Sequence, residues 1–195
     1  MRGVIKLELY EALLSRRSIG IVKEDPVRKE IIERILQVGT FAPNHFRTEP
    51  WRFFVLEGDA RKRLGDVFEE ITTLELEDIT TEESKKKLEK VKQNPLRAPV
   101  IIAVAVEPQL KKNVIEIEEY ASVHAAVQNM LLAAHDLGLG AIWRTGALCY
   151  HEKTKEFFHL SSNSQLVGFI YIGYPSKNLP KAKKTSFEHK TTWLN

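Results

Sequence analysis

The chain has 195 residues, of which 43% are hydrophobic and 28% are charged, and its formal net charge is +3. This composition is typical of an ordinary globular domain, and the near balance of charges argues against a nucleic-acid surface. Cys149 is the single cysteine, which excludes an intramolecular disulfide. No apolar run reaches the roughly 20 residues that span a bilayer, and the first residues lack the apolar core of a secretory signal. We therefore expect one cytoplasmic domain, residues 1–195, with neither membrane nor nucleic acid as a partner.

The N-terminal half of the sequence predicts two helices, a loop and a strand. Apolar residues at helical spacing over residues 7–14 predict a first helix, which ends in the basic turn SRRS (residues 15–18). Asp25-Pro26 has the character of an N-cap and first helical residue, so a second helix is expected from there to Gly39. The segment TFAPNHFRTEP (residues 40–50) has two prolines and no regular period, which predicts a loop leading into a strand.

The rest of the chain alternates helices and strands. The β-branched run VIIAVAV is typical of a strand buried on both faces, in the middle of a sheet. A long helix follows that is rich in alanine, which permits close packing against another helix or a partner subunit. The expected elements are helices over residues 59–71, 81–93, 114–137 and 151–158, strands over 51–56, 100–106, 141–143 and 166–171, a turn over 144–148, and a polar tail from 176 to 195.

Several familiar sites are missing from the sequence. The patterns GxGxxG, GxxxxGK[ST], HExxH and paired CxxC do not occur, which weakens Rossmann, P-loop and zinc interpretations, and no metal site is expected. His124 and His135 would lie about 16 Å apart on one helix at a rise of about 1.5 Å per residue, so they cannot share a metal ion. Cys149 and His151 are two residues apart, a spacing that usually points side chains away from each other and disfavours a nucleophile and base pair.

Two positions favour a binding site, although each also has a plain structural interpretation. The triplet Arg16, Arg17 and Ser18 offers guanidinium, hydroxyl and amide donors of the kind that hold a phosphate dianion. The same residues could be solvated charges after a helix. His45 lies in a proline-bounded loop, where a histidine has no evident core role and is either a functional residue or an exposed one.

Five motifs in order resemble the nitroreductase superfamily, and in particular its short YdjA-like branch. They are RRS (residues 16–18), GTFAPNHFRTEPWRFFVLEG (39–58), NPLRAPVIIAV (94–104), GLGAIWRTGAL (138–148) and VGFIYIGYP (167–175). The resemblance implies an α+β fold with a central, mostly antiparallel sheet surrounded by helices. It further implies an intertwined homodimer with FMN at the subunit interface and a C-terminal arm, residues 176–195, packed on the partner.

The resemblance also implies roles for single residues. Arg16, Arg17 and Ser18 match the family's phosphate and ribityl contacts, and Phe41 and His45 match flavin contacts. Arg144, Thr145 and Gly146 match the segment along the other side of the flavin, where a backbone N–H near Gly146 is expected to face N5, and residues 134–139 match a nicotinamide-nucleotide contact. No side chain is expected to act as the catalyst, because the chemistry belongs to the cofactor.

Two departures from the family pattern concern the pyrimidine edge of the flavin. Many relatives have a lysine two positions after the serine of the first motif, where this chain has Gly20. Many also have NxQPW where this chain has RTEPW, residues 47–51. The edge must therefore be held differently, with Arg47 or His45 as candidates.

The resemblance predicts an FMN-dependent NAD(P)H oxidoreductase. In a ping-pong cycle, NADH or NADPH would give hydride to FMN, and a small acceptor such as a nitroaromatic or quinone would then be reduced at the same face. Two alternatives stay open: a specialised flavin dehydrogenase of the same fold, and an FMN-binding sensor or scaffold that does not turn over. Nothing in the sequence selects the acceptor or distinguishes NADH from NADPH.

Overall fold

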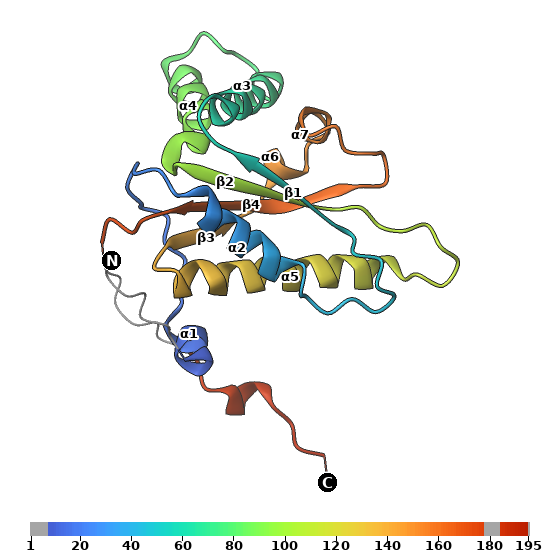
Figure 1. The fold of residues 1–195 in the computed structure, drawn as a ribbon. Helices are drawn as coiled ribbons and strands as arrows, with labels where there is room; N and C mark the ends of the chain where they lie inside the picture. The colour runs from blue at the N-terminus through green and yellow to red at the C-terminus, as the bar shows by residue number, and fades with distance from the viewer. Residues whose placement is uncertain (1–7, 178–183, 195) are drawn as a thin grey trace.

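The computed structural model describes residues 8–177 and 184–194, and within them the chain forms an α+β fold with a four-stranded sheet between two helical layers (Figure 1). The strand order is β1-β2-β4-β3, and each neighbouring pair is antiparallel. This confirms the predicted central antiparallel sheet. The strands are β1 (Trp51–Leu56), β2 (Val100–Val106), β3 (Gly140–Arg144) and β4 (Gln165–Gly173).

Strand β2 lies in the interior of the sheet because every one of its side chains can be buried. Its residues are all apolar and all buried, as the sequence predicts for a central strand. Ile102 and Val104 belong to one hydrophobic cluster, and Ile101 and Ala103 to another, because successive side chains of a strand point to opposite faces. The sheet thus separates two apolar cores.

Helices cover both faces of the sheet. The long helix α5 runs along one face with α2 packed beside it, and α3 and α4 lie on the opposite side of the sheet (Figure 1). Helix α1 packs on α5, and α6 contacts β4. The helices are α1 (Leu9–Ser15), α2 (Lys29–Gly39), α3 (Asp59–Leu74), α4 (Glu82–Lys92), η1 (Asn94–Arg97), α5 (Glu116–Asp136), α6 (Ala147–Tyr150), α7 (Glu152–Phe157) and η2 (Phe187–Lys190).

The segment between α1 and α2 is extended, which corrects the predicted start of the second helix. Helix α2 begins at Lys29, so Asp25-Pro26 does not cap it. Val22 forms a bridge with Pro175, and Val27 is buried. These contacts hold the chain in an extended conformation past the proline, and burial of Val27 outweighs the local capping preference.

A close contact between β3 and β4 depends on a residue without a side chain. Gly168 of β4 has φ of +149°, and a Cβ added there would overlap the indole nitrogen of Trp143 and approach the carbonyl oxygen of Arg144 at 2.9 Å. The indole N–H of Trp143 donates to the carbonyl of Val167 at 3.1 Å. Gly168 therefore permits Trp143 to lie flat on β4, and it fixes the end of β3.

Replacing Gly168 by alanine should destabilise the protein by about 3 kcal/mol, because the new methyl group forces Trp143 or the β3 backbone to move. Gly138 is the matched control: it also has positive φ, +76°, but a Cβ there meets nothing within 4 Å. Gly138→Ala should cost about 1 kcal/mol of backbone strain. Urea unfolding of both variants measures the difference, and equal losses would contradict this account of Gly168.

Candidate active site

The basic triplet lies beside the exposed edge of β3. Ser18 forms a parallel bridge with Ala141, and the next residue, Ile19, donates its N–H to the Ala141 carbonyl at 2.9 Å. Just before the triplet, the Ser15 hydroxyl is 2.8 Å from Nε2 of His135, near the C-terminal end of α5. Burial, and secondarily the charge of Arg16, lowers the pKa of His135, which favours the neutral imidazole. The triplet is thus fixed at one end of α5.

A cavity of about 300 Å³ opens next to the end of β3, on the sheet face that carries α3. Its aromatic walls come from α3, β3 and β4, and its charged groups are two arginines. None of the lining residues that the structure describes is acidic, so the cavity is electropositive. The lining residues are Phe68, Asn94, Arg97, Ile142, Trp143, Arg144, Thr145, Leu148, Cys149, Phe169 and Tyr171.

Arg144 is held in this cavity with part of its hydrogen-bonding capacity unused. Its guanidinium carbon lies 5.3 Å from the centre of the Tyr171 ring, in cation–π range. Its Nε is buried and makes no hydrogen bond to any residue within the described ranges. Burial raises the pKa of Tyr171 to about 12, so the neighbouring hydroxyl is uncharged at neutral pH. A ligand with ring nitrogens and carbonyl oxygens, such as the pyrimidine end of FMN, suits such donors.

Gly20 lies beside two side chains of β3. The atoms nearest to a Cβ built at Gly20 belong to Arg144, at 3.3 Å from Nη2, and to Ile142. The guanidinium of Arg144 therefore lies beside the position that carries lysine in many relatives. Arg47 and His45, the candidates from sequence, do not provide any of these three nearest atoms.

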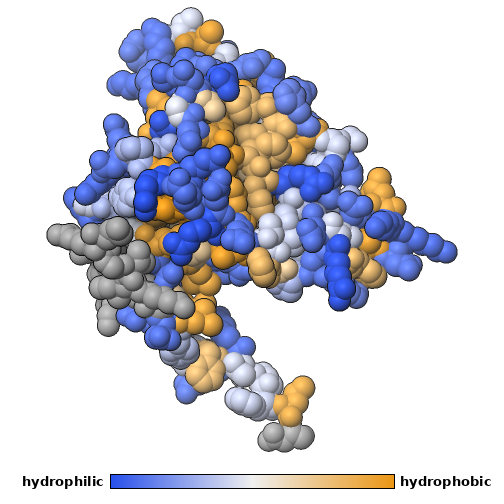
Figure 2. Space-filling model, viewed as in Figure 1, coloured by the Kyte–Doolittle hydropathy of each residue, from blue (hydrophilic) through white to orange (hydrophobic). Residues whose placement is uncertain are grey.

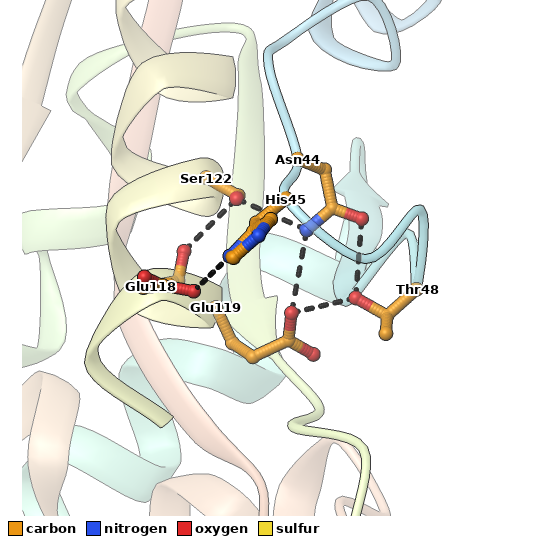
Figure 3. A network of polar contacts seen from close by, with 6 residues as sticks. All are labelled: Asn44, His45, Thr48, Glu118, Glu119 and Ser122. Atoms are coloured by element: carbon orange, nitrogen blue, oxygen red, sulfur yellow. Dashed lines mark hydrogen bonds and ion pairs between the residues drawn. The ribbon is translucent and has the colours of Figure 1, made fainter. Parts of the chain in front are cut away.

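The loop of residues 40–50 is tied to the N-terminal end of α5 by the polar network drawn in Figure 3. The carboxylate of Glu119, only 1% exposed, accepts hydrogen bonds from Thr48 Oγ1 at 2.6 Å and Asn44 Nδ2 at 3.3 Å. It also accepts one from the backbone N–H of Gln109 at 3.2 Å. Asn44 Oδ1 in turn accepts from the backbone N–H of Glu49 at 2.9 Å. These bonds fix the loop although it has no regular secondary structure.

Phe41 and His45 stand out from this fixed loop. Nδ1 of His45 is 2.7 Å from a carboxylate oxygen of Glu118 (Figure 3). The His45 ring lies against that of Phe46, with 4.1 Å between centroids. The side chain of His45 is 60% exposed, and Phe41 is 77% exposed. An exposed phenylalanine on an ordered loop favours a contact outside the chain itself.

The predicted site residues thus form two groups on one chain. Through β3, the structure brings together the triplet at residues 16–18 and the segment 144–146. His45 belongs to the other group, because it pairs with Glu118 while Ser15 pairs with His135. Phe41 follows α2, where the Val38 carbonyl accepts a hydrogen bond from Asn129 in the middle of α5. Glu118 and His135 are about 25 Å apart along α5, at the helical rise of about 1.5 Å per residue.

Sequence reasoning missed two residues of the cavity, Asn94 and Arg97. Both belong to the motif NPLRAP, which forms η1 immediately before β2. The sequence signal that could have identified Arg97 is its position between two prolines, just before a buried strand, where a charged side chain is not expected to serve the core. Their polar side chains add an amide and a second guanidinium to the cavity.

The histidine and cysteine positions that were disfavoured as catalysts have structural roles. Burial raises the pKa of Cys149 to about 12, which keeps its thiol protonated. His151 accepts a hydrogen bond from the N–H of Lys153 at 3.1 Å and caps α7. The ring of His124 packs 5.6 Å from that of Trp143. None of these forms a nucleophile and base pair.

The fold and the cavity define the class of protein. The family model described as "Nitroreductase family" matches residues 13–174. YdjA of Escherichia coli (strain K12) is 34% identical over 169 residues, which are 87% of this chain and 89% of that protein. Its name gives NAD(P)H nitroreductase as a provisional function. Iodotyrosine deiodinase 1 of Sus scrofa is 27% identical over 180 residues, 87% of this chain and 62% of that protein.

Solved structures agree with this result. A nitroreductase-like family protein from Bacillus cereus matches with a TM-score of 0.82 and 28% identity, covering 96% of each chain. A Desulfovibrio desulfuricans structure matches with a TM-score of 0.70 and 26% identity, covering 94% of this chain and 95% of that one. It is a complex with FMN of a protein provisionally named a nitroreductase.

The chain belongs to the nitroreductase family. Its fold is the α+β fold of that family, and membership makes it an oxidoreductase. Within the described part of the chain, no helix is both long and apolar enough to cross a membrane.

Glu119→Gln should lower the free energy of unfolding by about 1–3 kcal/mol, because an amide in this buried place turns one acceptor into a donor facing other donors. Glu118→Gln is the matched control, since that side chain is 38% exposed and its loss should cost less than about 1 kcal/mol. Urea unfolding gives both values. Hydrogen exchange should show faster opening of residues 41–49 in Glu119→Gln, and an unchanged rate would contradict the anchoring role.

Proposed function

We propose that this protein is an FMN-dependent NAD(P)H oxidoreductase that reduces small electron-poor acceptors, such as nitroaromatics or quinones, by ping-pong hydride transfer. The observation that carries the proposal is the electropositive, aromatic cavity at the end of β3, next to the basic triplet beside the same strand. The names of the relatives support it, since YdjA is named for NAD(P)H and the Desulfovibrio desulfuricans structure for FMN.

The residues divide the work of holding FMN. Arg16, Arg17 and Ser18 would bind the phosphate and ribityl chain, since they combine guanidinium and hydroxyl donors at the edge of β3. Arg144, Thr145 and Gly146 would lie along the isoalloxazine ring, with a backbone N–H near Gly146 toward N5. The bound FMN would supply the hydride-accepting centre. Reduction of the flavin would require no acid or base from the chain, because the hydride would pass directly from nicotinamide to flavin. The protons that the acceptor takes up in addition to hydride would come from solvent.

Homodimer formation is part of the proposal, and the length of α5 supports it. One FMN that contacts the triplet of residues 16–18 is too far from His45 of the same chain, about 25 Å along α5, to be contacted by it. A second copy can supply Phe41 and His45 to that FMN. Exposed apolar side chains favour such an interface: Leu9 and Leu14 of α1 are 71% and 66% exposed.

The C-terminal arm would pack on the partner subunit. Its described part, residues 184–194, carries Phe187 at 67% and Trp193 at 80% exposure. In Figure 2, apolar side chains stand out below the body of the molecule, where Figure 1 places α1 and this arm. Residues 178–183 and 195 of the predicted arm lie outside the described residues. A partner surface would bury these aromatic side chains, which their own chain leaves exposed.

A specialised flavin reaction is the second candidate, and iodotyrosine deiodinase 1 among the relatives favours it.

In the main proposal, the nicotinamide nucleotide would bind near residues 134–139, next to a cavity of about 290 Å³ lined by Arg17, His135 and Lys177 among others. A cytoplasmic location belongs to the same proposal and fits the lone buried cysteine.

Purified wild-type protein should bind FMN, and NADH or NADPH should bleach the flavin band under anaerobic conditions. Arg16→Ala should weaken FMN binding at least about tenfold, because a charge-assisted phosphate contact is lost. Arg34→Ala, an exposed arginine on α2, is the control that should bind normally. Flavin fluorescence quenching gives both constants. Failure of the wild type to bind FMN refutes the proposal, and binding without NAD(P)H oxidation supports a sensor or scaffold instead.

Mixing two inactive variants should restore activity if two chains build each site. In a heterodimer of Arg16→Ala and His45→Ala chains, one site carries both changes and the other carries neither, so roughly half of its sites are intact. Co-expressed variants should therefore be more active than either alone, as measured by nitroaromatic-dependent NAD(P)H oxidation. Activity equal to the mean of the two variants would show that Arg16 and His45 serve the same FMN from one chain.

A further inference from the structure

We infer that Arg97 and Arg144 act as a pair that binds the N1–C2=O end of the flavin and raises its reduction potential, in place of a lysine at Gly20. The inference rests on the proposed function, since it presumes FMN in the cavity at the end of β3. It assigns a role to Arg97, for which the sequence suggested none, and a specific role to Arg144.

The first argument is the composition of the cavity. Arg97 and Arg144 both line it, and none of the lining residues within the described ranges carries a carboxylate. Arg97 is exposed and Arg144 is half-buried, so both guanidinium groups are cations at this cavity with no counter-ion among its lining residues. Such a cavity favours a ligand that carries or gains negative charge.

The second argument is the placement of the Arg144 guanidinium. Its Nε is enclosed by the chain and has no hydrogen-bond partner among the described residues, so a ligand in the cavity would meet its Nη groups. The ring of Tyr171 holds the guanidinium at 5.3 Å, so these donors are fixed in direction before the ligand arrives. Such preorganised donors act most strongly where charge develops during a reaction.

The third argument is steric and concerns Gly20. The backbone there is not in the left-handed region, so its conformation permits a side chain. A Cβ there would lie 3.3 Å from Nη2 of Arg144, so a longer side chain and the guanidinium would compete for the same space. Glycine at this position and arginine at 144 are thus complementary.

The chemistry gives the pair its function. Bound FMN would accept a hydride from the nicotinamide, that is two electrons and one proton, so the ring would gain one negative charge, which its N1–C2=O end would carry. A cation next to that end binds the reduced cofactor more tightly than the oxidised one. The ratio of the two affinities sets the reduction potential, and a tenfold change in that ratio is about 30 mV for a two-electron couple.

The experiment measures the FMN midpoint potential of the wild-type protein and five variants by anaerobic reduction against a reference dye. Arg97→Gln and Arg144→Gln should each favour the oxidised cofactor about tenfold, a fall of about 30 mV. Arg34→Gln, on the opposite face of the sheet, should leave the potential unchanged. The double variant Gly20→Lys with Arg144→Gln should regain most of the potential lost in Arg144→Gln, because the lysine enters the space that the arginine leaves. Arg144→Lys keeps a charge in the cavity and tests whether a folding defect explains the loss.

The outcomes separate this inference from the proposed function. Wild-type protein that binds FMN and is reduced by NAD(P)H, with unchanged potentials in Arg97→Gln and Arg144→Gln, overturns the inference and leaves the proposed function standing. Unchanged potentials together with a raised KM for 4-nitrobenzoate, but not for nitrobenzene, show that the arginines bind an anionic acceptor instead, which also overturns it. Wild-type protein that binds no FMN refutes the proposed function itself.

Discussion

The rigid helix α5 is the constraint on which the site depends. It packs against α2 and the sheet, and its buried side chains prevent it from bending or sliding. Ser15 is tied to its C-terminal end through His135, and the loop of residues 40–50 is tied to its N-terminal end through Glu119. Because both ties are short hydrogen bonds, the distance between the two groups of site residues is set by the length of the helix.

The predicted elements agree best with the structure where burial and periodicity act together. The run VIIAVAV became the doubly buried strand β2, and the alanine-rich segment became α5 within two residues of each predicted end. The start of α2 was wrong because Asp25-Pro26 is a local signal, whereas Val22 and Val27 are held by residues distant in sequence. Contacts between distant segments override a capping preference worth about 1 kcal/mol.

The predicted site residues divide in the same way. Some are revealed by local sequence motifs, and others depend on contacts between segments that are distant in the sequence. The triplet at residues 16–18 and the segment 144–146 were found as motifs, and the structure places both along β3. Asn94 and Arg97 were missed because a single sequence does not reveal that η1 and the end of β3 border one cavity. The replacement for the missing lysine could not be chosen either, since the proximity of Gly20 to Arg144 arises only when the extended segment after α1 lies against β3.

The pairing of Gly20 with Arg144 has a consequence for how the site can change. Lysine on the segment after the triplet is attached to a chain that pairs with β3 by only one bridge, whereas Arg144 belongs to β3 itself and rests on Tyr171. A cation on the strand is held more firmly, because its backbone is in the sheet and its guanidinium is planar and stacked. The cost is the buried Nε, which has no hydrogen-bond partner among the described residues. A site of this kind couples the binding of its ligand to the order of the cavity, since the same arginine stabilises both.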